Sequence, residues 1–155
     1  MSIDDRQSLE LERMSEAECL NALKGGVFGR LSFNLDDGPT ILPVNYAFVD
    51  GCIVMRTARG SKLAMTPMTQ VAFEIDDVDT YRTWGWSVVA RGRAFDITNA
   101  VDEQSENLRL LPFVPWLRGD RHHVIKINVH EVSGRRFGIP LPKNADGLFG
   151  NHIDL

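Results

Sequence analysis

Basic and hydroxyl side chains gather in residues 56–66, which read RTARGSKLAMT and follow the apolar run CIVM. These side chains belong to Arg56, Thr57, Arg59, Ser61 and Lys62. Ser61 can cap a short helix SKLAM, whose first turn would offer free backbone N–H groups and the positive end of a helix dipole. Such a set can hold a phosphate group through charge-assisted hydrogen bonds, each worth roughly 1.5–3 kcal/mol. The alternative, a turn whose basic side chains face water, fits the spacing equally well.

A polar pair interrupts an apolar strand pattern in LPVNYAFV, residues 42–49. Asn45 and Tyr46 are neighbours there, so their side chains point to opposite faces of the predicted strand. Asparagine is disfavoured in the middle of a strand, and its amide needs hydrogen-bond partners if it is buried. Those partners could lie across a bulge near Pro43, or they could be the polar edge of a ligand, which is the interpretation we favour.

Two tryptophans lie in WGWSVVARGR, residues 84–93. One face of this predicted strand carries Trp84, Trp86, Val88 and Ala90, and the other carries Ser87, Val89, Arg91 and Arg93. Tryptophans beside small residues can wall a planar aromatic ligand, but they are also common in core and interface packing. Arg91 and Arg93 could meet a phosphate or pair with the acids of EIDDVD. For each residue taken singly, packing or pairing is the simpler interpretation.

Hydrolytic and metal chemistry find little support in the sequence. His122 and His123 are adjacent on a predicted strand, so their side chains point apart and do not suit a common metal ion. The segment DDVDT lacks the glycine and the closing glutamate of a calcium-binding loop. No serine lies in a nucleophile elbow, and neither Cys19 nor Cys52 has an activating neighbour in the sequence. We therefore expect no metal, and these patterns identify no catalytic residue.

The overall composition, 155 residues with 43% hydrophobic and 25% charged side chains, is ordinary for a single folded domain. A net charge of −4 argues against non-specific binding to nucleic acid or to an anionic membrane. No apolar run approaches the roughly 20 residues that span a bilayer, and the acidic start MSIDDRQ is unlike a secretory signal. Cys19 and Cys52 are typical of small apolar residues in a reducing compartment. We therefore expect a cytoplasmic protein without nucleic-acid or membrane partners.

The elements that must position these residues are mostly short strands. The pattern predicts a helix over 15–26, opened by a capping box of Ser15 and Glu18 and ended by a glycine pair. A second helix is predicted over 99–111, with Asn99 as its cap. Alternating apolar residues predict strands over 27–34, 40–49, 52–57, 70–76, 83–97 and 122–137.

Turn signals between these strands favour antiparallel hairpins in a small, mainly β barrel with short helices. Pro43 should lie at an edge or a bulge, because it cannot donate to a strand ladder. Gly85 and Gly92 suggest a bend in the long strand or the close approach of another group. The chain is expected to divide into a polar lead-in over 1–14, the barrel domain over 15–138 and an irregular tail over 139–155.

Taken together, these stretches resemble the pyridoxamine 5'-phosphate oxidase-like family of FMN-binding split β-barrels. The resemblance covers residues 15–136 and rests on an ordered set of segments: the first helix with GVFGRLSF, then LPVNYAFVDGCIVMRTARGSKL, then VAFEID, then GWSVVARGRA. The chain looks closest to the small bacterial members. The resemblance implies an antiparallel, Greek-key-like split β-barrel and a homodimer that holds FMN at the subunit interface.

By this resemblance, three groups of residues hold the flavin. Its phosphate would be bound by Arg56, Thr57, Ser61 and Lys62. The isoalloxazine ring would lie along Val44, Asn45 and Tyr46, and beside Trp86, Ser87 and Val88 of the same or the partner subunit. Asn45 and Ser87 are the candidates for polar contacts to the ring. The resemblance implies an FMN-dependent oxidoreductase that acts on an unidentified small molecule, with the redox chemistry supplied by the flavin itself.

Substrate and cofactor stay open at this point. The chain is shorter than the pyridoxamine 5'-phosphate oxidases proper, and SGRRFGIP is the nearest match to their C-terminal substrate-binding segment. Arg135 and Arg136 in it could contact an acidic substrate or form a solvated hairpin end. Related split barrels use the deazaflavin F420 or haem, and an axial haem ligand would come from His122, His123, His130 or His152. A non-catalytic flavin-binding or sensing module is the other alternative, since no substrate residue is recognisable.

Overall fold

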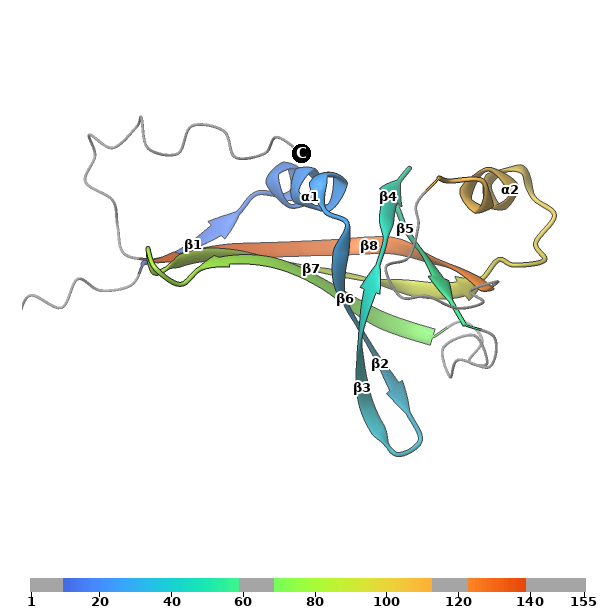
Figure 1. Ribbon diagram of the computed structural model, residues 1–155, viewed down its shortest axis with the longest axis horizontal. Helices are drawn as coiled ribbons and strands as arrows, with labels where there is room; N and C mark the ends of the chain where they lie inside the picture. Colours follow the sequence, from blue (N-terminus) through green and yellow to red (C-terminus); the bar gives the residue numbers. More distant parts are fainter. Residues whose placement is uncertain (1–9, 59–68, 113–122, 139–155) are drawn as a thin grey trace, which may run out of the picture.

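The computed structural model describes residues 10–58, 69–112 and 123–138 (Figure 1). The elements, in chain order, are β1 (Glu10–Met14), α1 (Glu16–Gly25), β2 (Phe28–Leu35), β3 (Gly38–Asn45), β4 (Ala47–Val49), β5 (Cys52–Thr57), β6 (Thr69–Asp79), β7 (Trp84–Asp96), α2 (Glu103–Arg109) and β8 (His123–Gly138). Mostly antiparallel β-structure with two short helices confirms the predicted fold class.

The strands form one sheet in the order β3-β2-β6-β7-β8-β5-β4, with β1 paired to β8. The two end strands, β3 and β4, are consecutive in the chain, with only Tyr46 between them. The sheet therefore curls until its two edges meet, which makes a barrel. β2 pairs with β6 only from Arg30 to Phe33, whereas β6 continues along β7 as far as Asp79. The barrel wall thus opens between the start of β2 and the end of β6.

β7 and β8 are longer than the barrel needs. They pair from Trp84 with Gly138 to Asp96 with Ile125, and the register shifts between Arg91 and Gly92. Figure 1 shows them running together as a long ribbon beyond the barrel, with β1 laid along the outer part of β8. This ribbon carries the predicted tryptophan segment away from the barrel centre.

Two buried clusters hold the fold together. The larger fills the barrel and includes Leu31, Phe73, Met55 and Ile125, together with Leu23 from α1. The smaller lies under α2 and consists of Cys52, Val54, Ile97, Leu108 and Val124. β5 contributes to both, because its alternate side chains face the barrel interior and α2. Burial on both faces explains the unbroken apolar run CIVM at its start.

Several local predictions are confirmed. Ser15 and Glu18 form a capping box at the start of α1, and the helix ends at the glycine pair. Pro43 lies in β3, an end strand of the sheet order. Gly85 and Gly92 do mark close approach: a Cβ on Gly85 would lie 2.8 Å from the Asp77 carbonyl oxygen, and one on Gly92 would overlap that of Asn128. Packing against neighbouring backbone therefore explains both glycines.

Other predictions need correction. Residues 10–14, expected in the polar lead-in, form β1 and pair with β8. The strand predicted over 40–49 is divided at Tyr46, where the chain changes partner strands. The second helix is shorter than predicted, and its cap is Asp102 and not Asn99, because the Asp102 carboxylate accepts a hydrogen bond from the Ser105 backbone at 2.9 Å.

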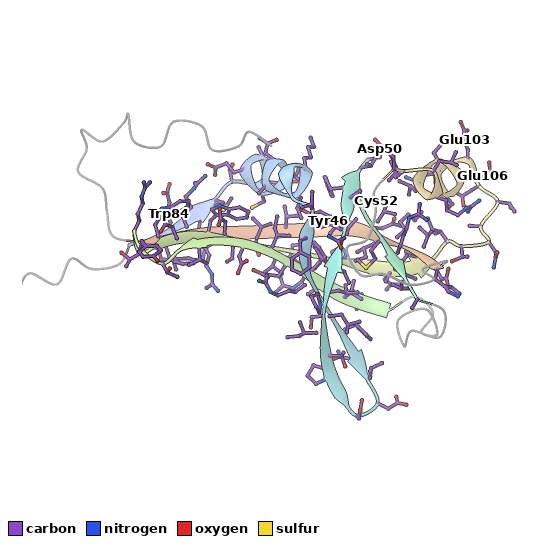
Figure 2. The ribbon with its side chains drawn as sticks, in the orientation of Figure 1. Tyr46, Asp50, Cys52, Trp84, Glu103 and Glu106 are labelled. Atoms are coloured by element: carbon purple, nitrogen blue, oxygen red, sulfur yellow. The ribbon has the colours of Figure 1, made fainter. Side chains whose placement is uncertain are left out.

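Tyr46 connects α1 to the point where the barrel closes. Its side chain is only 2% exposed, its hydroxyl donates to the Leu23 carbonyl oxygen at 2.8 Å, and its ring meets Phe73 edge-on with centroids 4.8 Å apart. Figure 2 shows Tyr46 beneath α1, where β3 passes into β4. Burial raises the pKa of Tyr46, so the hydroxyl stays protonated and keeps donating.

Replacing Tyr46 by phenylalanine is expected to lower the free energy of unfolding by about 1 kcal/mol, because the buried Leu23 carbonyl loses its donor. Tyr81 is 99% exposed, so Tyr81→Phe is the matched control and should leave stability unchanged. Urea unfolding of both variants measures the difference. Equal stability of Tyr46→Phe and wild type would contradict the role given to this hydrogen bond.

Candidate cofactor-binding site

Two predicted groups of site residues meet where β3 passes into β4. β4 pairs Ala47 with Val54 of β5, and β3 also contacts β5. The segment 44–46 therefore runs beside the C-terminal half of β5, which ends with Arg56 and Thr57. Barrel closure thus joins the predicted ring-binding segment to the start of the predicted phosphate-binding segment.

Arg56 and Thr57 point to opposite faces of β5. The Arg56 guanidinium lies on the α2 side, where its Nη2 donates to the carbonyl oxygen of Arg109 at 2.8 Å and to that of Leu111 at 3.5 Å. These carbonyls lie at the C-terminal end of α2, where a cation also complements the helix dipole. Thr57 is 6% exposed and follows the barrel-facing residues Ile53 and Met55. Ser61 and Lys62 lie outside the described residues, so their part in the site stays a prediction.

The segment 44–46 offers one polar side chain near the opening of the barrel. Asn45 is half-buried, and its amide nitrogen donates to the Val27 carbonyl oxygen at 3.3 Å. Val44 packs against the barrel core, and the Tyr46 side chain is held by Leu23 and Phe73 as described above. Asn45 is therefore the residue of this segment whose side chain is bonded to the chain at the start of β2.

A cavity of about 580 Å³ lies beside this segment, between α1 and the start of β2. It is lined by Met14, Glu18, Asn21, Ala22, Gly25, Gly26, Val27, Phe28, Arg30, Ile75, Asp76, Asp77, Trp86 and Arg136. Its volume falls within the usual range for small-molecule sites. Trp86 forms part of its wall, whereas Ser87 points to the other face of β7 and the Val88 side chain is wholly buried. Of the three predicted residues on β7, Trp86 is thus the one that lines a cavity.

Ion pairs at the cavity rim hold its charged side chains in place. Arg30 contacts Glu74 at 2.8 Å and Asp76 at 3.2 Å, and these two acids raise its pKa. Burial raises the pKa of Glu74 despite this arginine. On the α1 side, Arg136 contacts Glu18 at 2.9 Å. The hydrogen bond from the Ser15 backbone, together with Arg136, lowers the pKa of Glu18.

These pairs correct two interpretations of the arginines. Arg135 and Arg136 lie where β8 pairs with both β7 and β1, so they are not at a hairpin end, although Arg135 is exposed to solvent as expected. Arg91 pairs with Glu131 of β8 at 3.3 Å and not with an acid of EIDDVD. Those acids pair with Arg30 instead, a residue that no motif singled out.

The two ends of the predicted site are far apart within one chain. Thr57 pairs with His123 at the start of β8, and Trp86 pairs with Arg136 near its end. Thirteen positions of β8 separate these partners, which is roughly 40 Å at the rise of an extended strand. Figure 2 likewise shows Trp84 at the far end of the ribbon from Cys52 of β5. Thr57 and Trp86 are therefore far apart along β8.

A second polar cluster, which the sequence patterns did not identify, lies beside Thr57. His123 Nδ1 is 2.9 Å from Asp96 Oδ2, and the Thr98 backbone N–H donates to Asp96 Oδ1 at 2.9 Å. The Thr98 hydroxyl also donates to Asp96 and accepts from the Val124 backbone at 3.0 Å. Burial opposes the charge on Asp96, but the hydrogen bonds from Thr98 and His123 outweigh it and lower the pKa of Asp96.

The sequence carries only a weak signal for this cluster. Asp96 and Thr98 have the spacing of a local turn in which an aspartate accepts from the backbone two residues on. His123 follows 27 residues after Asp96, and only the pairing of β7 with β8 brings the two together. His122, His152 and Arg59 lie outside the described residues, and His130 is exposed at the bulge in β8.

No helix within the described ranges is long and apolar enough to cross a membrane. Within the same ranges, no group of three or more histidine, cysteine, aspartate or glutamate side chains could hold a metal ion. Cys19 and Cys52 are buried free thiols.

Fold and site together define an antiparallel split β-barrel with a cavity where its wall opens. The family described as pyridoxamine 5'-phosphate oxidase matches residues 15–136, so the chain belongs to the pyridoxamine 5'-phosphate oxidase family. This confirms the resemblance drawn from the sequence.

Individual relatives support the assignment. An uncharacterized protein of Mycobacterium tuberculosis, Rv0080, is 32% identical over 137 residues, covering 84% of this chain and 86% of its own. The solved structure of an FAD-binding protein from Mycobacterium smegmatis is 30% identical with a TM-score of 0.66, over 81% of this chain and 97% of that one. A conserved protein of unknown function from Corynebacterium diphtheriae is 29% identical with a TM-score of 0.67, over 82% and 98%.

Proposed function

We propose that this protein is a flavoprotein that binds FMN or FAD between two copies of the chain and acts as an oxidoreductase on a small molecule. The observation that carries the proposal is the barrel closure at Tyr46, which brings the segment 44–46 beside Arg56 and Thr57. Family membership and the 30% identical FAD-binding protein from Mycobacterium smegmatis support a flavin as the ligand.

The proposed phosphate site lies at the end of β5. Thr57, Ser61 and Lys62 would bind the flavin phosphate, since hydroxyl and ammonium groups suit that anion. Arg56 would contribute by holding α2 beside the end of β5, through its hydrogen bonds to the Arg109 and Leu111 carbonyls. Its guanidinium also adds positive charge to this region.

The proposed ring site combines two copies of the chain. Val44, Asn45 and the Tyr46 backbone would lie along one edge of the ring, with the Asn45 amide near its polar atoms. Trp86 would come from the partner copy, because roughly 40 Å of extended β8 lies between the strand partners of Trp86 and Thr57 within one chain.

Exposed apolar side chains support the proposed homodimer. Val27 and Phe28 are 59% and 39% exposed at the cavity, and Leu11 and Val78 are exposed on the ribbon end. Apolar patches of this kind commonly mark interfaces. The buried thiols Cys19 and Cys52 suit a reducing compartment, so we propose that the dimer acts in the cytoplasm.

A bound flavin would supply the redox chemistry, by accepting and donating electrons at its ring. The protein's part is to hold the phosphate, to orient the ring and to exclude water from one side of it. Trp86 would cover part of the ring with an apolar surface. A hydrogen bond from the Asn45 amide to the ring would stabilise one redox form over the other.

The absorption spectrum of freshly purified protein tests the proposal. We expect flavin bands near those of free FMN or FAD, and tight binding of one flavin per chain when the apoprotein is titrated. The double variant Ser61→Ala/Lys62→Ala should lose most of this affinity, whereas Arg91→Ala, which removes only a surface ion pair with Glu131, should keep it.

The same titration separates the alternatives. Quenching of F420 fluorescence or a Soret band with haem, in protein that takes no flavin, would replace flavin as the ligand. Reduction by NADH or NADPH and reoxidation by an added acceptor would distinguish an oxidoreductase from a non-catalytic flavin-binding module. A protein that binds neither FMN nor FAD contradicts the proposal.

A further inference from the structure

The cluster of Asp96, Thr98 and His123 lies at the start of β8, away from the part of β8 that α1 covers. Asp96 ends β7, and His123 begins β8 directly opposite Thr57 of β5. Directly opposed residues of an antiparallel pair place their side chains on the same face, with Cβ atoms roughly 5 Å apart. His123 and Thr57 are therefore neighbours on one face of the sheet.

That face is the barrel interior. On β5, Ile53 and Met55 precede Thr57 at alternate positions, and both belong to the barrel core. On β8, Ile125 and Ile127 follow His123 at alternate positions and belong to the same core. The imidazole and the threonine hydroxyl thus lie where the apolar interior ends, with the His123 side chain 27% exposed.

The other cationic side chains near this end of the barrel form hydrogen bonds with groups away from Thr57. Arg56 donates to the Arg109 and Leu111 carbonyls on the α2 side, and Arg109 donates to the Ile97 and Ala100 carbonyls. Lys126 donates to the Gln104 side chain and lies over the Phe95 ring. Within the described part of the chain, His123 is thus the group on the Thr57 face that can carry positive charge.

Asp96 sets which ring nitrogen of His123 is available. Its carboxylate accepts from both Thr98 donors and lies 2.9 Å from His123 Nδ1, an arrangement that keeps a proton on Nδ1. Nε2 has no hydrogen-bond partner among the described residues, and it becomes a donor when the ring is protonated. A protonated imidazole beside a hydroxyl is a suitable partner for a phosphate oxygen.

We propose that His123, oriented by Asp96, donates from Nε2 to the phosphate group of the bound flavin, next to Thr57. The inference rests on the proposed flavin binding and adds a phosphate contact that the motif RTARGSKL does not contain. Asp96 is a positioning residue in this scheme, since it acts through the imidazole. The ligand class is a phosphate or diphosphate ester, and riboflavin, which lacks one, would not use the contact.

Equilibrium titrations with FMN, FAD and riboflavin test the proposal on wild type, His123→Gln and Asp96→Asn. His123→Gln should weaken FMN and FAD binding by roughly tenfold or more, as expected for the loss of one charge-assisted hydrogen bond, and should leave riboflavin affinity unchanged. Asp96→Asn should give a smaller loss of the same selectivity. His130→Gln replaces an exposed histidine of the same strand and should bind all three ligands as wild type does.

Equal loss of FMN and riboflavin would show that the variant is misfolded or that His123 is purely structural, and it would overturn the proposal. Unchanged FMN affinity in His123→Gln would overturn it too. A wild-type protein that binds no flavin at all would instead contradict the proposed function.

Discussion

Mixing a Lys62→Ala protein with a Trp86→Ala protein is expected to restore flavin binding that neither variant retains alone. If the phosphate is held by one copy and the ring is covered by Trp86 of the other, a mixed dimer contains one site with both defects and one intact site. Roughly 40 Å of β8 between the Thr57 and Trp86 positions makes this shared arrangement the one that a flavin can occupy.

Random exchange of subunits makes half of the dimers mixed, so about one quarter of all sites should bind flavin. Unfolding and refolding the two variants together, followed by flavin titration, measures this fraction. Each variant refolded alone is the baseline and should bind almost none. Absorbance of bound flavin after gel filtration gives the count per chain.

A second mixture tests the same arrangement through a loss of binding. Wild type refolded with the double variant Lys62→Ala/Trp86→Ala should bind flavin at about one quarter of all sites after exchange, compared with about one half when the two are only combined. A site built within a single chain would give no recovery in the first mixture and no loss in the second. Those two results together would contradict a site shared between two copies of the chain.

Gly92→Ala is expected to cost about 3 kcal/mol of folding free energy, at the upper end of the usual cost of overpacking. A Cβ at Gly92 would overlap the Asn128 carbonyl oxygen and lie 2.9 Å from Ile127 Cγ2. The nearest obstacle is backbone in the middle of β8, so it cannot move away as the end of a flexible side chain could. The register shift of the β7–β8 pair falls at the same place.

Urea unfolding measures this cost, and Gly25→Ala is the matched control. Nothing lies within 4 Å of a Cβ at Gly25, and alanine is the better helix former, so that variant should be neutral or more stable by up to about 1 kcal/mol. Similar stability of the two variants would contradict the close approach of β7 and β8 at this point. A Gly92→Ala protein that fails to fold would agree with it.

Local signals in the sequence were sufficient for most elements. The capping box at Ser15 and Glu18, the glycine pair after α1 and the alternation on each strand depend on neighbours a few residues apart, so they can be read without the fold. The start of α2 was misplaced because Asn99 and Asp102 are both good caps. Arg109, which donates to the Ile97 and Ala100 carbonyls, holds the preceding residues in a turn.

Contacts between residues that are far apart in the sequence cannot be predicted from local patterns. The sequence does not predict β1, because its charged side chains break the apolar alternation. This strand is formed by its pairing with β8. Arg56 donates to a carbonyl at the end of α2, and Arg136 donates to Glu18. Each of these hydrogen bonds joins residues more than fifty positions apart in the sequence. A basic residue in a motif therefore does not reveal whether its charge faces a ligand or the protein itself.

The sequence by itself determined that the chain is a small antiparallel barrel of the pyridoxamine 5'-phosphate oxidase family, because strand periodicity, turns and ordered motifs are local properties. Only the tertiary structure decided which side chains meet: Tyr46 closing the barrel onto α1, His123 facing Thr57 beside Asp96, and Trp86 at the far end of β8. These pairings follow from strand register across the curled sheet, and register is set by the packing of the whole core.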